Sequence, residues 1–174
     1  MRNRYSLIQI SLHWATLVMI ILTYSAMLSR GMFSEDDESF INLFHFNFGI
    51  TVWLLMFIRL GLRHYYGTPP IEPPLAEWQS IASKGLHWML YLLFLSLPIL
   101  GFLTLQFGGK DWVLYGFTVP QWVTPDPSWR KLLKQTHETL ANTGYFLIGF
   151  HTLAALYHHY IRRDDTLRRM LPGK

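Results

Sequence analysis

Four long stretches of this chain contain no Asp, Glu, Lys or Arg, and no other feature constrains the fold as strongly. They run from Tyr5 to Ser29, from Ser39 to Ile58, from Gly85 to Gly109 and from Thr139 to Ile161. Each has about 20 residues or more, enough for an α-helix to cross a hydrocarbon core of about 30 Å. Because the backbone must satisfy its own hydrogen bonds within a bilayer, we expect four transmembrane helices. Their approximate bounds are 7–29, 39–62, 82–107 and 132–161.

The fold class that follows is all-α, an integral membrane four-helix bundle formed by residues 1–174 as a single domain. Hydrophobic residues make up 51% of the 174 and charged residues only 15%, against about 25% in a soluble domain. The net charge of +4 is carried at the edges of the apolar stretches, which favours a lipid partner and excludes nucleic acid. Pro98 is expected to kink the third helix without ending it.

The residue types exclude several kinds of site. The chain has no cysteine, which excludes disulfides, thiolate iron–sulfur clusters, catalytic thiols and covalently attached c-type haem. The segment 137–141 reads HETLA and lacks the second histidine of the H-E-x-x-H zinc motif. No nucleotide-binding loop is present.

The distribution of Lys and Arg predicts the orientation. With both termini in the cytoplasm, ten of these residues lie on the inner side and five on the outer side, as the positive-inside rule requires. The outer five are Arg30, Lys110, Arg130, Lys131 and Lys134. We therefore predict a multi-pass protein of the bacterial inner membrane with both termini cytoplasmic.

Histidines within the predicted helices are the most informative polar residues, because ionisable groups in a membrane are costly and usually functional. The alternating helix directions put His45 and His137 near the outer face. The same directions put His13, His87 and His151 near the inner face. The histidines therefore fall into two layers.

The spacing of the last pair supports this arrangement. His137 and His151 are 14 residues apart, which is about 21 Å of helix and a return to within about 40° of the same face. Ala141 and Gly144 lie between them on that face and leave room for a flat macrocycle, as Gly49 does on the second helix. Small residues also let helices approach each other, so this support is partial.

Opposed imidazoles from facing helices are how a helical bundle holds a b-type haem. The outer layer offers one such pair, His45 with His137. The inner layer has three candidates for two axial positions, and geometry alone does not choose between His13 and His87. We predict two non-covalent b-type haems, against the alternative that single histidines merely form hydrogen bonds in packing.

Three segments of the sequence resemble the bacterial cytochrome b561 family. They are 10–14 (ISLHW), 92–101 (LLFLSLPILG) and above all 137–146 (HETLANTGYF), and the likeness extends to the end of the chain. The resemblance implies a four-helix, two-haem inner-membrane protein in which His13 pairs with His151 and His45 with His137.

The members that the chain resembles most are described as oxidising superoxide and reducing ubiquinone. The resemblance therefore implies a superoxide:quinone oxidoreductase, with superoxide and ubiquinone as partners. Lys134 and Arg130 lie one and two turns before His137 and are expected to attract superoxide at the periplasmic face. The alternative for these cations is membrane anchoring or solubility.

Two further predictions concern the electron acceptor and the partner protein. His158 and the unassigned His87 are candidates for the quinone site, although His158 at the water boundary and a hydrogen-bonded His87 are the plainer interpretations. Other family members serve as cytochrome subunits, so the alternative function is to relay electrons between a partner dehydrogenase or hydrogenase and the quinone pool.

Overall fold

The structure is a computed structural model, and it describes residues 4–32, 34–109 and 111–172. Four long helices account for most of these residues. In chain order the elements are α1 (Leu7–Leu28), α2 (Glu35–Tyr66), α3 (Glu77–Gly108), β1 (Trp112–Leu114), β2 (Phe117–Val119), α4 (Pro127–Tyr157), the π-helical turn η1 (His158–Arg162) and the 3-10 turn η2 (Arg168–Met170).

The helix ends follow local signals more closely than they follow the edges of the uncharged stretches. α1 begins at a capping box in which Ser6 and Gln9 bond each other's backbone N–H. α4 begins where the Asp126 carboxylate accepts from two backbone N–H groups and proline occupies the first turn. α2, α3 and α4 start at 35, 77 and 127, four or five residues before the predicted starts at 39, 82 and 132. Their first turns are polar, so these turns precede the uncharged stretches from which the helices were predicted.

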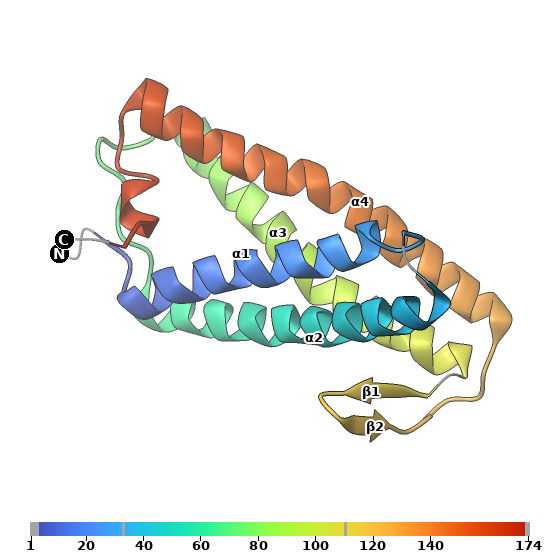
Figure 1. Cartoon of the computed structure of the whole chain (residues 1–174). Coiled ribbons are helices and arrows are strands. Elements are labelled where there is room, and N and C mark those ends of the chain that lie inside the picture. The colour runs from blue at the N-terminus through green and yellow to red at the C-terminus, as the bar shows by residue number, and fades with distance from the viewer. Residues whose placement is uncertain (1–3, 33, 110, 173–174) are drawn as a thin grey trace.

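The helices form two closely packed pairs. α1 packs along α2, α3 packs along α4, and α2 also contacts α3. The start of α1, the end of α4 and η2 lie at one end of the bundle, and the β1–β2 hairpin lies at the opposite end (Figure 1). We call these the terminal end and the hairpin end. Between them lies a core of buried side chains from α2 and α3, namely Val52, Met56, Tyr91, Leu93, Phe94 and Leu97.

Among the described residues, three helices are long and apolar enough to cross a membrane: α1, α2 from Glu38 onward, and α3. α3 is continuous through Pro98, as predicted. α4 is long enough but is not one of them: its first half carries four charged residues, and its uncharged second half includes the polar Asn142, Thr143 and His151. The fourth crossing therefore stays a prediction that depends on the uncharged stretch from 139 to 161.

The prediction of an all-α chain was incomplete, because the connection between α3 and α4 contains a small antiparallel hairpin. In it Trp112 pairs with Val119 and Leu114 with Phe117. Two buried amides hold this connection against the bundle. Asn47 donates to the Val113 carbonyl and accepts from the Tyr115 N–H. Such short strands have no long alternating pattern that would reveal them in the sequence.

Gln106 is the second of these amides and is 1% exposed. It donates to the Pro120 carbonyl (3.0 Å) and accepts from the Trp122 N–H (2.8 Å). Buried amides inside membrane helices need partners, and here the loop backbone supplies them. The hairpin end of the bundle is therefore closed by a fixed segment.

Gly144 allows a close contact between α4 and α1. The Tyr24 hydroxyl donates to the Ala141 carbonyl of α4 (2.9 Å), and a Cβ added at Gly144 would clash with that same hydroxyl oxygen. The same Cβ would also lie 3.2 Å from Leu93. The small residues at 141 and 144 thus admit a tyrosine in this structure, where the sequence suggested room for a macrocycle.

We predict that Gly144→Ala lowers the free energy of unfolding by about 1–3 kcal/mol, because the added methyl group has no space. Removing the hydroxyl with Tyr24→Phe should recover much of the loss in the double variant. Thermal unfolding of detergent-solubilised protein measures both. Gly61→Ala is the matched control, since a Cβ at Gly61 meets nothing within 4 Å. Equal melting temperatures for Gly144→Ala and the parent chain would contradict the prediction.

Candidate functional site

The histidines nearest the hairpin end lie ring to ring. The ring centroids of His45 on α2 and His137 on α4 are 6.1 Å apart, with an interplanar angle of 75°. Nδ1 of His45 lies 3.0 Å from the Thr23 carbonyl of α1, and Nδ1 of His137 lies 2.9 Å from the Leu97 carbonyl of α3. All four helices therefore contribute to this pair.

Gly101 explains how the His137 ring fits against α3. A Cβ at this position would lie 3.4 Å from His137 Cε1, so a larger residue would press directly on the imidazole. The Leu97 carbonyl that faces Nδ1 of His137 lies one turn before Gly101 on the same helix. α3 thus provides both the space and the hydrogen-bond acceptor that orient this ring.

The three histidines nearer the terminal end also lie together. The ring centroids of His13 and His151 are 6.2 Å apart, and those of His87 and His151 are 5.2 Å apart. Nδ1 of His87 lies 2.6 Å from the Ser83 carbonyl of its own helix. Nδ1 of His13 faces the Arg59 guanidinium of α2 at 2.9 Å. This cluster also draws on all four helices.

These distances fit a metal ion held between two imidazoles. A metal lies about 2 Å from a ligating imidazole nitrogen, and the ring centre lies about 1 Å farther, so opposed ligands have centroids about 6 Å apart. The two pairs at 6.1 and 6.2 Å match that separation. A ligating histidine usually donates its second N–H to a carbonyl, as His45 and His137 are placed to do. The hairpin-end pair therefore fits an iron centre with two axial histidines in both separation and hydrogen bonding, and the terminal-end pair fits in separation.

The family model of prokaryotic cytochrome b561 matches residues 4–173. The chain belongs to this cytochrome b561 family. Its members are membrane electron-transfer proteins that bind b-type haem. The haem expected from the histidine pairs is therefore of the type that the family binds.

Similar proteins match the cytochrome over almost its whole length. Cytochrome b561 homolog 1 of Escherichia coli (strain K12) is 48% identical over 174 residues, covering 99% of each chain. A probable superoxide oxidase of Yersinia pestis is 39% identical over 175 residues, covering 100% of this chain and 99% of its own. Cytochrome b562 of Cereibacter sphaeroides is 28% identical, covering 96% and 94%.

The basic residues proposed to attract superoxide lie at the hairpin end, in the first turns of α4. Lys134 and Glu138 form an exposed ion pair of 3.6 Å. The Arg130 side chain packs on the end of α3, where a Cβ on Gly108 would lie 3.2 Å from its Nε. Lys134 thus has an acidic partner, and Arg130 packs against α3. Lys110, another of the five cations predicted on the outer side, lies outside the described residues.

The two histidines considered for quinone lie at the terminal end but in different surroundings. His87 belongs to the cluster around His151. His158 begins η1, and its Nδ1 lies 2.5 Å from the Asp164 carboxylate, whose side chain is fully buried. Among the described residues, no hydrogen bond or ring contact joins His87 to His158.

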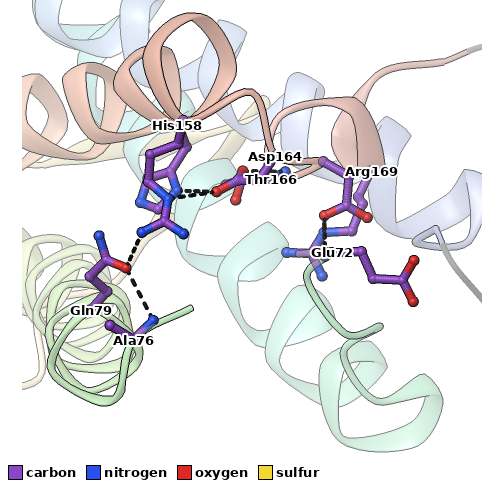
Figure 2. A network of polar contacts seen from close by, with 9 residues as sticks. Glu72, Ala76, Gln79, His158, Asp164, Thr166 and Arg169 are labelled. Atoms are coloured by element: carbon purple, nitrogen blue, oxygen red, sulfur yellow. Dashed lines mark hydrogen bonds and ion pairs between the residues drawn. The ribbon is translucent and has the colours of Figure 1, made fainter. Parts of the chain in front are cut away.

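A network of polar contacts fixes the chain beyond α4 (Figure 2). Asp164 accepts from His158 and from the Thr166 N–H (3.0 Å), and it lies 3.5 Å from Arg162 Nε. Arg162 in turn donates to the Gln79 side chain of α3 at 2.5 Å. The C-terminal segment is thereby tied to both α3 and α4 beside the terminal-end histidines.

Sequence reasoning missed the residues that orient the histidines. Gly101, Arg59 and Asp164 show their roles only through partners 36, 46 and 6 positions away in the chain. Of the three, Arg59 carried a usable signal. It follows His45 by 14 residues, the same interval that separates His137 from His151.

Burial by itself would raise the pKa of the Asp164 carboxyl, but hydrogen bonds from His158 and Thr166 outweigh it, and the pKa lies below the ordinary value of 3.8. A lowered pKa stabilises the fold above 3.8, and this contribution disappears as the pH falls through the folded-state pKa. We therefore predict that Asp164→Asn is less stable than the parent chain at pH 7. The loss should be on the order of 3 kcal/mol and should shrink below pH 3.8.

Thermal unfolding of the two proteins across this pH range measures the effect. Glu138→Gln, which breaks an exposed ion pair, is the control and should change little. A difference between Asp164→Asn and the parent chain that stays constant with pH would show that the carboxylate charge is not responsible.

Proposed function

We propose that this cytochrome holds two b-type haems and uses them to oxidise superoxide at the periplasmic face of the inner membrane and to reduce ubiquinone. In this proposal His45 and His137 are the axial ligands at the hairpin end, and His13 and His151 are those at the terminal end. The observation that carries it is the presence of two histidine pairs with nearly equal ring separations, one toward each end of the bundle.

The haems would supply reversible one-electron transfer at iron. The electron balance requires two superoxide anions for each quinone, giving two molecules of oxygen and, with two protons, one quinol. The donor is a small anion in water and the acceptor is a lipid-soluble molecule. A protein with a redox centre near each membrane face can connect the two.

The chain's own residues would orient these ligands. The Thr23 and Leu97 carbonyls lie within hydrogen-bond distance of Nδ1 of His45 and His137, which leaves Nε2 of both rings available. Gly101 keeps α3 close to the His137 ring. Buried Asn47 and Gln106 hold the hairpin segment at this end of the bundle. These contacts support a rigid site whose ligands move little when the charge of the iron changes.

Two observations support superoxide as the donor. The chain is 39% identical to a protein named as a probable superoxide oxidase. Residues 127–138 carry three basic side chains, Arg130, Lys131 and Lys134, against the single acidic Glu138. All four are exposed, so this segment presents net positive charge at the hairpin end. Such a surface raises the encounter rate of a small anion.

Quinone reduction is assigned to the terminal end. Reducing a quinone to a quinol requires protons, and this end contains His87 beside His151 and the His158–Asp164 pair. His158 held by a carboxylate is well suited to donate a proton or a hydrogen bond. A cytochrome subunit that receives electrons from a partner dehydrogenase or hydrogenase is the alternative outcome of the tests below.

Haem content tests the ligand assignment. We predict that the purified protein contains two b-type haems and that His45→Ala and His13→Ala each retain about one. Pyridine haemochrome spectra normalised to protein measure this ratio. His64→Ala, an exposed histidine near the end of α2, is the control and should retain both haems. One haem in the parent chain, or two in either ligand variant, would contradict the assignment.

Visible spectra under a flux of superoxide test the donor. We predict rapid appearance of reduced b-type bands that a dismutase abolishes, followed by reoxidation when ubiquinone is added. In the double variant Arg130→Gln/Lys134→Gln the rate should fall several-fold at low ionic strength, and the difference should fade at high salt, where charges are screened.

Lys84→Gln removes an exposed charge near the terminal end and is the matched control, with no expected change. A haem that stays oxidised under superoxide would eliminate this donor and favour a partner dehydrogenase. An unchanged rate and salt dependence in the double variant would refute the role of these two cations, but it would leave superoxide as the donor.

A further inference from the structure

Arg59 is a basic residue on α2 that forms a hydrogen bond with the histidine cluster at the terminal end. Its Nη2 lies 2.9 Å from Nδ1 of His13, and its Nη1 lies 3.7 Å from the Met56 sulfur of the buried core. Arg59 follows His45 on α2 by 14 residues, which is about 21 Å of helix and nearly the same face. It therefore lies at the level of the terminal-end histidines and points into the bundle.

No carboxylate of the described residues forms an ion pair with Arg59. The acidic residues on the segment that closes this end bind elsewhere. Asp164 pairs with His158 and Arg162, and Asp165 pairs with Arg169. A charge within a membrane helix is costly unless an opposite charge or water meets it. The Arg59 side chain is partly buried, and its guanidinium faces His13 inside the bundle.

His13 does not provide that opposite charge. A guanidinium only donates hydrogen bonds, so Nδ1 of His13 must accept, and the proton of a neutral imidazole is then on Nε2. A nitrogen that ligates iron needs a free lone pair. Nδ1 of His45, His87 and His137 each faces a backbone carbonyl instead, the arrangement that leaves Nε2 unprotonated. Ligation through Nε2 of a neutral His13 therefore requires Arg59 to bond another acceptor.

We propose that Arg59 pairs with a propionate of the terminal-end haem and that its charge raises the reduction potential of that haem. The pairing is chemically matched, because a guanidinium binds a carboxylate through two parallel hydrogen bonds. A fixed positive charge also disfavours the oxidised, more positive iron. This inference rests on the two-haem arrangement proposed above, and it adds the residue that would make the terminal-end haem the better electron acceptor.

Redox titration of the parent chain, Arg59→Gln and Arg59→Lys tests the proposal, with haem content measured on each sample. The midpoint that is missing in His151→Ala identifies the terminal-end haem. One unit charge within about 10 Å, at an effective dielectric constant of about 20, changes an equilibrium about tenfold. We therefore expect Arg59→Gln either to lose this haem selectively or to lower its midpoint by about 59 mV, the one-electron equivalent of tenfold. Arg59→Lys keeps the charge and should stay close to the parent chain.

Arg30→Gln removes an equal charge at the hairpin end and is the matched control. It should leave the terminal-end midpoint unchanged. The proposal is overturned if Arg59→Gln keeps two haems with both midpoints unaltered, or if Arg59→Lys behaves like Arg59→Gln. A parent chain with a single haem would instead refute the two-haem arrangement itself, so the two failures are distinguishable.

Discussion

The contact on which the rest of this bundle depends is the one between the histidine rings of different helices. His45 and His137 come from helices that are not joined by a short loop, and each ring is oriented by a carbonyl of a third or fourth helix. This arrangement fixes the axial position and rotation of all four helices at once. A shift of one residue in any of them would move a ring or its acceptor by about 100° around the helix axis.

Polar contacts at both ends make that arrangement rigid. At the hairpin end, Asn47 and Gln106 bind the backbone of the loop between α3 and α4. At the terminal end, Arg169 donates to the carbonyls of Pro69 and Pro70, and the Trp14 indole donates to the Met170 carbonyl. These groups replace the water that buried amides and guanidinium groups would otherwise need. The loops therefore contribute to the stability of the histidine clusters as well as connecting the helices.

The two clusters differ electrostatically, and this difference bears on function. Each ring of the hairpin-end pair faces one carbonyl acceptor, and the basic first turns of α4 precede His137. The terminal-end cluster contains a third histidine, His87, and the partly buried cation Arg59. A positive charge favours the reduced state of a neighbouring redox centre. In the proposed function, Arg59 would therefore favour electron acceptance at the terminal end.

The sequence by itself determined the long helices and the two levels of histidines along the bundle, because long uncharged stretches and a helical rise of about 1.5 Å per residue are local properties. It also grouped His45 with His137, since alternating helix directions put both near the same face. The sequence did not reveal the hairpin, the Tyr24 side chain that occupies the space at Gly144, or the partners of Asp164 and Arg59. Those depend on contacts between residues far apart in the chain or on the fold of a short turn. Only the tertiary structure decides which carbonyl faces each Nδ1. That choice depends on how each helix is rotated about its own axis, and a stretch that is apolar on all sides does not reveal this rotation.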